Sequence, residues 1–358
     1  MRVVVLGGFG NFGTRICRAL ANDAGIEVLA AGRTARSADG VQLDLAASDF
    51  PASLKRLAPA VVIHCAGPFQ SQGYRVAEAS IAAGAHYIDL ADGREFVARF
   101  AASNDSAARA ADLAAISGAS TVPALSSAVI DSLSGGFRQI DEIQISIAPG
   151  QRAPRGAATI ASVFSYAGRS FKWLNDGVWK DAWGWQELRR VRLAGLGTRW
   201  AAACNIPDLE LLPARYSGVK TVEFHAALEI AVQHFGLWLV AALRRVGFPL
   251  PIERWAVPLN RLASLLDVFG SERGGMLVSL AGERTDGSRA RMEWHLTADA
   301  NHGPEIPCMA AILLTRKLAR GELSARGAFP CMGFLTLSDF EPEFVQWGMT
   351  TVVEEYAI

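Results

Sequence analysis

The chain has 358 residues, of which 51% are hydrophobic and 20% charged, a composition that excludes disordered and fibrous proteins. Its length predicts two domains. The 35 basic residues balance the 35 acidic ones, so the chain lacks the positive field of a nucleic-acid-binding protein. Five cysteines form no CxxC pair, which predicts reduced thiols in a cytoplasmic protein, with no disulfide framework and no metal site. No secretory signal is expected, since the first six residues run directly into a glycine-rich turn.

The amino-terminal segment predicts a nucleotide-binding turn. Residues 3–6 form a short apolar run typical of a strand buried on both faces of a parallel sheet. A turn follows, made of Gly7, Gly8, Phe9, Gly10, Asn11, Phe12 and Gly13. The glycines at 8, 10 and 13 fit GxGxxG and precede a helical pattern, so the backbone and the helix N-terminus can approach a pyrophosphate.

The second strand, predicted over residues 26–31, bears on the choice of cofactor. An NAD-binding protein usually places Asp or Glu after this strand, whereas this chain has Arg33, Thr34 and Arg36. Guanidinium groups match the oxygens of a 2′-phosphate, so NADP(H) is favoured and NAD(H) is the alternative. Asp44, in the third predicted strand (residues 41–45), is interpreted as an acceptor for the adenine amino group or as a surface turn residue.

Strands and helices then alternate. A buried strand is predicted over residues 61–66, and the loop of Ala66, Gly67 and Pro68 lies at its end. This loop is expected beside the nicotinamide half of the cofactor because ligands lie beyond the carboxyl ends of parallel strands. Helices are predicted over residues 73–83 and 96–110, and strands over residues 85–90 and 113–117. This order predicts an α/β fold, a Rossmann-type doubly wound parallel sheet.

Four motifs carry a resemblance to a known family. They are the segments 65–70, 83–93, 118–127 and 327–333. The chain resembles the saccharopine dehydrogenase-like oxidoreductases. The resemblance implies an NAD(P)-binding Rossmann domain over residues 1–123 with a returning tail (about 325–358), joined to a substrate and dimerisation domain over residues 124–324. It also implies nicotinamide-dependent redox chemistry, with Gly8, Gly10 and Gly13 at the phosphates.

The second half has a different pattern. Residues 141–147 and 289–296 alternate apolar and polar side chains, and an Asp286-Gly287 hairpin turn precedes the second of these segments within residues 275–298. This pattern predicts an antiparallel sheet in a second, α+β domain. Residues 230–243 contain no Asp, Glu, Lys or Arg, but they are too few to span a membrane. A buried or subunit-interface helix is expected there, with interfacial membrane contact as the alternative.

Few residues are suited to acid–base chemistry. Asp92 follows a predicted strand at the carboxyl edge of the sheet, and His302 lies in a loop after the antiparallel hairpin, so both are candidate catalytic residues. Arg152 and Arg155 precede a predicted helix and could hold a substrate carboxylate or phosphate, or else form a solvated basic loop. Tyr74 has no lysine four residues later, which disfavours short-chain dehydrogenase chemistry.

These features together predict an NADP(H)-dependent oxidoreductase that transfers hydride to or from a C=N or C=O bond of a small or medium organic substrate. A homodimer is expected, with no nucleic-acid partner. Two alternatives remain open, a reductase of lipid-like enoyl or keto substrates and a non-catalytic NADP(H)-binding sensor or scaffold.

Overall fold

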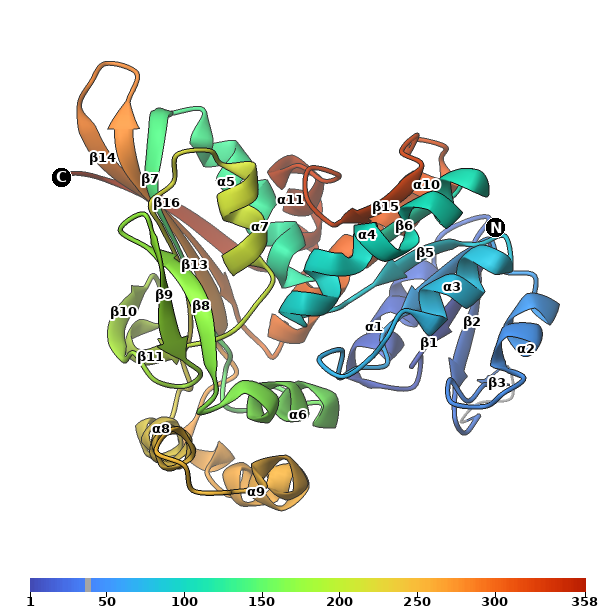
Figure 1. Ribbon diagram of the computed structural model, residues 1–358, viewed down its shortest axis with the longest axis horizontal. Coiled ribbons are helices and arrows are strands. Elements are labelled where there is room, and N and C mark those ends of the chain that lie inside the picture. The colour runs from blue at the N-terminus through green and yellow to red at the C-terminus, as the bar shows by residue number, and fades with distance from the viewer. Residues whose placement is uncertain (36–39) are drawn as a thin grey trace. The chain divides into compact units, whose positions relative to one another are not determined.

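The computed structural model describes residues 1–35 and 40–358 (Figure 1). The chain divides into two compact units. Unit 1 comprises Met1–Leu125 and Pro304–Leu335, and unit 2 comprises Ser126–Gly303 and Thr336–Ile358. Each unit is therefore built from two separate stretches of the chain.

Unit 1 contains a seven-stranded sheet in which all neighbouring strands are parallel. The strand order is β15-β6-β5-β4-β1-β2-β3. The strands are β1 (Arg2–Leu6), β2 (Glu27–Gly32), β3 (Val41–Gln42), β4 (Val61–His64), β5 (His86–Asp89), β6 (Ala114–Ser117) and β15 (Gly327–Pro330). The chain adds strands outward from β1 on one side and then, from β4, on the other. The predicted doubly wound Rossmann-type sheet is confirmed.

Helices connect the strands of unit 1. They are α1 (Asn11–Leu20), α2 (Phe50–Arg56), α3 (Arg75–Ala82), α4 (Arg94–Ala110) and α10 (Ile306–Ala319), with a short irregular turn η1 (Thr121–Leu125). The central strands β1 and β4 are continuous apolar runs because both of their faces are covered, and Val3, Val4 and Val5 have no exposed surface. Helix α10 packs on α1, where the buried Glu305 accepts a hydrogen bond from Arg18 at 3.1 Å.

Unit 2 contains a mixed nine-stranded sheet. Its main path is β10-β11-β12-β7-β13-β14-β16, with β8 paired to β12 and β9 to β8. The strands are β7 (Phe137–Ala148), β8 (Ser170–Asn175), β9 (Val178–Trp183), β10 (Arg189–Leu193), β11 (Gly197–Ala203), β12 (Thr221–Ala226), β13 (Gly274–Arg284), β14 (Arg289–Ala298) and β16 (Thr350–Ala357). The predicted antiparallel hairpin is β13–β14, while β12 and β7 pair in parallel. The predicted α+β second domain is confirmed.

The helices of unit 2 complete its core. They are α5 (Ser126–Ser134), α6 (Ala157–Tyr166), α7 (Asp208–Arg215), α8 (Ala231–Arg245), α9 (Ala256–Ser264) and α11 (Leu337–Gln346), with short turns η2 (Ile252–Trp255) and η3 (Asp267–Phe269). Helix α5 packs on β7 and β13, whose inward side chains Ile143, Ile145 and Val278 are fully or almost fully buried. Among the described residues, no helix is long and apolar enough to cross a membrane.

The segment of the chain that returns to unit 1 has other bounds than the sequence predicts. The expected tail of the first domain was about 325–358, but the returning segment begins at Pro304 and ends at Leu335. It begins earlier because α10 buries its apolar side chains against unit 1. It ends earlier because β16 pairs residue by residue with β14, from Thr350 opposite Thr297 to Ala357 opposite Ala290. The last 23 residues, Thr336–Ile358, therefore belong to unit 2, and β16 within them extends its sheet.

Candidate functional site

The glycine-rich turn lies at the point where the strand order of unit 1 reverses. Leu6 at the end of β1 pairs with Ala31 of β2 on one side and with His64 of β4 on the other. Gly7 follows with a φ of 81°, a conformation that favours glycine. A Cβ atom on Gly7 would lie 3.1 Å from the backbone nitrogen of Ala66, so the turn and the loop after β4 are in direct contact. Ligands of doubly wound sheets bind at such a reversal point.

Helix α1 is pressed against this turn, and its N-terminus is open. A Cβ atom on Gly13 would lie 2.2 Å from the carbonyl oxygen of Gly7, a separation that only glycine avoids. Gly10 is the exposed N-cap residue, and no side chain among the described residues caps the helix. Its first-turn N–H groups, including those of Phe12 and Gly13, have no acceptor within the helix, and they carry the positive end of the helix dipole. This arrangement fits a pyrophosphate.

The end of β2 provides the predicted adenosine side of the site. Arg33 and Thr34 directly follow β2 and are exposed. The Phe9 ring covers Gly32, on which a Cβ atom would lie 2.9 Å from Phe9 Cδ2, so the glycine-rich turn reaches the end of β2. Arg36 lies outside the described residues. Asp44 is exposed, and its Oδ1 atom accepts a hydrogen bond from the backbone N–H of Ala46 at 3.0 Å. That bond agrees with the turn interpretation of Asp44.

The loop after β4 is fixed by a residue that sequence reasoning missed. Gln72 Nε2 donates hydrogen bonds to the carbonyl oxygens of Ala66, at 2.8 Å, and Pro68, at 2.9 Å. Ala66, Gly67 and Pro68 are half-buried. The loop therefore has a defined shape beside the glycine-rich turn. A single glutamine in a loop gives no sequence signal for this contact.

Asp92 lies in the loop after β5, where the sequence predicts it. Its Oδ1 atom accepts a hydrogen bond from Gln70 Nε2 at 3.0 Å, and the residue is half-buried. The structure thereby joins the loop after β4 to the loop after β5. Asp92 is thus held at the carboxyl edge of the sheet, where it can meet a ligand bound at this edge.

Asp89, which the sequence interpretation did not select, organises the same edge. Its side chain is completely buried at the end of β5. Oδ1 accepts hydrogen bonds from the backbone N–H groups of Ala91 (3.0 Å) and Gly118 (2.8 Å) and from the Ser117 hydroxyl (3.0 Å). Burial raises the pKa of this carboxyl to about 6, although these hydrogen bonds oppose the shift. A carboxyl that closes a buried strand is the signal that could have identified it.

His64 forms a second buried contact at this edge. Its Nδ1 atom lies 3.1 Å from the Tyr87 hydroxyl, and its ring meets the Phe69 ring edge-on. Burial lowers the pKa of His64 to about 4, so the imidazole is neutral at physiological pH. This agrees with a core role for His64.

The predicted substrate-binding arginines belong to unit 2 and contact the η3 turn. Arg152 Nε donates to the backbone carbonyl of Asp267 at 3.0 Å, and a terminal nitrogen of Arg155 lies 3.0 Å from the Asp267 carboxylate. Gln151 Nε2 also donates to this carboxylate, at 2.8 Å. These contacts hold the segment before α6 against η3. Their role toward a substrate stays a prediction.

His302 also belongs to unit 2. Its Nδ1 atom lies 2.8 Å from the backbone carbonyl oxygen of Trp347, and the two rings meet edge-on with centroids 5.0 Å apart. Because that carbonyl can only accept, Nδ1 carries the proton and Nε2 of the neutral ring is the basic atom. Its catalytic role stays a prediction.

Comparison with protein families identifies the amino-terminal domain. Residues 3–121 match the family described as the saccharopine dehydrogenase NADP binding domain. The match spans β1 to β6 and includes the glycine-rich turn, the end of β2 and the loop after β4. The predicted membership of the saccharopine dehydrogenase-like family is confirmed for this domain, as is the expectation of an NADP(H) site. A search of curated protein sequences found no match.

Solved structures share the fold of the whole chain. Saccharopine dehydrogenase (L-Glu forming) from Saccharomyces cerevisiae matches with a TM-score of 0.66 and 12% identity, covering 99% of this chain and 100% of that one. Homospermidine synthase from Legionella pneumophila, solved in complex with NAD, matches with a TM-score of 0.56 and 10% identity, covering 100% and 91%. An engineered D-amino acid dehydrogenase bound to NADP+ matches with a TM-score of 0.51 and 15% identity, covering 96% and 98%. At these identities the likeness shows the fold.

Proposed function

We propose that the protein is an NADP(H)-dependent oxidoreductase that transfers hydride to or from a C=N or C=O bond of a small or medium organic substrate. The observation that carries the proposal is the open N-terminus of α1, pressed on the glycine-rich turn within a domain of an NADP-binding family. The proposal is supported by the fold, which recurs in saccharopine dehydrogenase, homospermidine synthase and an engineered amino acid dehydrogenase.

Most of the predicted site residues have a place in this proposal. Bound NADPH supplies a hydride, and the protein must hold the cofactor, orient the substrate and provide a proton. The turn from Gly7 to Gly13 holds the pyrophosphate, and Arg33 and Thr34 bind the 2′-phosphate. The loop of Ala66, Gly67 and Pro68 orients the nicotinamide. Asp92 serves as proton donor or acceptor at the sheet edge.

Unit 2 provides the substrate side of the proposed reaction. His302 takes part in proton transfer through Nε2, and Arg152 and Arg155 offer charge for an anionic substrate group. We further propose that the enzyme is a cytoplasmic homodimer. The free state of all five cysteines supports a reducing compartment.

A second candidate function is a non-catalytic NADP(H) sensor. It is favoured by one observation, that both predicted acid–base residues already have partners, Asp92 in Gln70 and His302 in the Trp347 carbonyl. The two functions differ in turnover, because a sensor binds the cofactor without consuming it.

The distinguishing experiment combines cofactor binding with a substrate screen. NADPH consumption should be followed with ketones, imines and amino acid–keto acid pairs, beside thermal shifts with NADPH and with NADH. An enzyme shows a raised melting temperature and turnover that Asp92→Asn reduces at least about 100-fold, the lower end of typical acid–base contributions. Raised melting temperature without turnover of any substrate class supports the sensor. No shift with either cofactor overturns both functions.

A further inference from the structure

The helical part of unit 2 exposes many large apolar side chains. Eighteen such side chains are strongly exposed among the described residues, and ten of them lie between residues 232 and 269. We call these ten the apolar surface: Val232, Phe235, Leu239, Val246, Phe248, Trp255, Leu262, Leu265, Val268 and Phe269. Soluble monomers rarely expose so dense an apolar surface unless it binds a partner or a membrane.

Helix α8 carries apolar side chains both on the side that packs on the core of unit 2 and on the side that is exposed. One side of α8 packs on the core formed with α6 and Trp185, through the buried Ala241 and the half-buried Leu237. Val232, Phe235 and Leu239 follow helical spacing on the opposite side, where Val232 is 75% and Leu239 54% exposed. A surface helix ordinarily places polar residues there. Helix α8 is thus apolar on two opposite sides. On the exposed side the Phe235 ring meets the Trp200 ring edge-on, with centroids 5.7 Å apart, while Val232 and Leu239 stay mostly exposed.

The apolar surface continues onto α9. Gln233 Nε2 near the start of α8 donates to the carbonyl oxygen of Ala263 near the end of α9, at 2.8 Å. This bond holds the two helix ends together. Leu262 and Leu265, on either side of Ala263, are both strongly exposed. The exposed side chains of α8 and α9 therefore belong to neighbouring elements.

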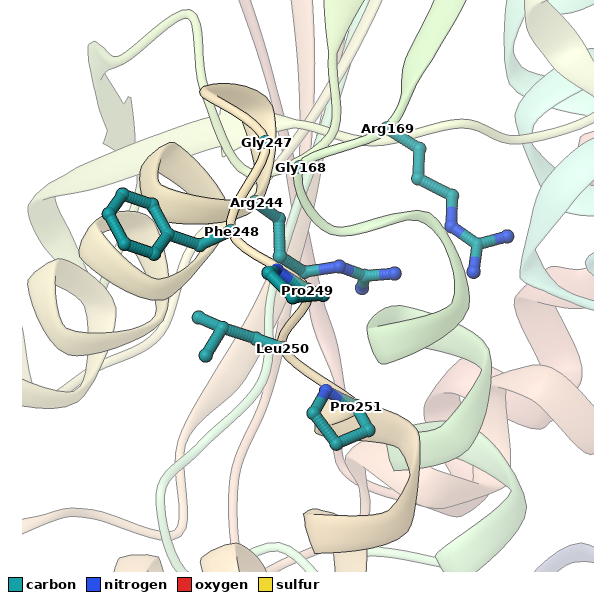
Figure 2. A pocket seen from close by; sticks show the side chains of 8 residues that line it. All are labelled: Gly168, Arg169, Arg244, Gly247, Phe248, Pro249, Leu250 and Pro251. Carbon is teal, nitrogen blue, oxygen red and sulfur yellow. The ribbon is translucent and has the colours of Figure 1, made fainter.

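The charge around the apolar surface is positive. Between residues 232 and 269, which span the apolar surface, the sequence has four arginines, at positions 244, 245, 254 and 261, and two acidic residues, at positions 253 and 267. Arg245 and Arg261 are exposed. Arg244 lines a cavity of about 440 Å3 together with Arg169 and Phe248. Figure 2 shows the Phe248 ring projecting to the opposite side from the Arg244 guanidinium, so apolar and cationic groups diverge from one short segment.

We propose that the apolar surface docks the protein on an anionic lipid membrane. Apolar side chains flanked by arginines are the composition of interfacial helices, which insert their apolar side at the headgroup boundary while the cations meet lipid phosphates. Self-association through this surface is disfavoured because it would bring two sets of arginines together. The proposal concerns binding at the membrane surface and is independent of the proposed redox function.

Vesicle flotation of the full-length protein tests the proposal. Vesicles of phosphatidylcholine alone should be compared with vesicles that also contain phosphatidylglycerol, at low and high salt. We expect binding to the anionic vesicles that falls as salt rises. The double variant Leu239→Ser/Phe248→Ser should weaken binding about tenfold or more, since each side chain loses buried apolar area. Arg261→Glu should reduce the preference for the anionic lipid.

The matched control is Val178→Ser/Val345→Ser, which changes two exposed apolar residues of unit 2 outside the apolar surface (58% and 79% exposed). It should bind vesicles like the wild type. Unchanged melting temperatures would show that all variants are folded. Absence of wild-type binding, or equal loss in the control, overturns the proposal. A dimer measured by light scattering without lipid, and abolished by Leu239→Ser/Phe248→Ser, would assign the surface to a second copy and also overturn it.

Discussion

At the residue scale, the site depends on a few groups whose roles follow from charge and burial. Arg33 is exposed directly after β2, where a dinucleotide-binding domain places the group that contacts the adenosine ribose. The positive charge of the Arg33 side chain predicts NADP(H), the cofactor with a 2′-phosphate, over NAD(H). In contrast, the hydrogen-bond partners of Asp89 could not be predicted, because Ser117 and Gly118 are distant from it in the sequence.

Arg33→Ala is expected to weaken NADPH binding about 10- to 100-fold and to leave NADH binding almost unchanged, because a charge-assisted hydrogen bond to the 2′-phosphate is lost. Fluorescence titration with both cofactors measures the difference. The matched control is Arg99→Ala, which removes an exposed arginine of α4 that forms an ion pair with Glu95. Equal weakening of the two cofactors by Arg33→Ala would contradict the 2′-phosphate role.

Asp208 predicts a pH dependence of stability. It is fully buried in unit 2, its Oδ1 accepts a hydrogen bond from Ser126, and its Oδ2 has no partner among the described residues. Burial raises its pKa from 3.8 to about 7. Because the folded-state pKa is the higher one, the protonated group stabilises the fold below about pH 4. This contribution falls as the pH rises and is lost once the pH passes about 7.

Between pH 4 and pH 8, Asp208 should therefore lower the free energy of unfolding by on the order of 4 kcal/mol. Asp208→Asn removes this titration, so its free energy of unfolding should gain on that of the wild type as the pH rises. Urea unfolding across this range measures the difference. A constant difference between the two proteins from pH 4 to pH 8 would rule out the buried, titrating carboxyl.

At the scale of elements, the sequence predicts most of unit 1. Strands β1 and β4 are buried on both faces. Their continuous apolar sequences therefore indicate central strands of the parallel sheet. The β13–β14 hairpin was also placed from its sequence pattern, although the first nine residues of β13 and the last five of β14 are all buried. Sequence patterns could not place β16, because seven of its eight residues are exposed and its register depends on the edge of β14. Pairing partners are long-range information that local patterns do not contain.

Gly13→Ala tests how α1 is seated on the turn. The added Cβ would lie 2.2 Å from the Gly7 oxygen and 2.7 Å from Gly8 Cα, both backbone atoms, so α1 must move away. We expect a loss of about 1–3 kcal/mol in unfolding free energy and loss of NADPH binding. Thermal unfolding and cofactor titration measure the two effects. Gly73→Ala, where a Cβ meets nothing within 4 Å, should change neither.

At the scale of the whole molecule, unit 1 is discontinuous in the chain. Its sheet ends with β15, which pairs with β6, and α10 packs on α1. The predicted domain, residues 1–123 with a returning tail at about 325–358, includes β15 but not α10. The family match ends at residue 121 and includes neither element. The nucleotide-binding fold is therefore completed by residues that follow most of unit 2 in the sequence.

A fragment of residues 1–125 should accordingly fail to unfold cooperatively, whereas the same residues joined by a flexible linker to residues 304–335 should fold and bind NADPH. The reason is that α10 contributes eight buried residues, which the shorter fragment lacks. Circular dichroism melting compares the two fragments. Similar cooperative transitions in both would show that α10 and β15 are dispensable.

The central claim is that the glycine-rich turn and the N-terminus of α1 bind the pyrophosphate of NADP(H). Isothermal titration calorimetry of NADPH and NADH into the full-length protein tests it most directly. We predict one binding site in each chain, with NADPH bound more tightly than NADH. Absence of binding heat for both cofactors at millimolar concentration would contradict the claim.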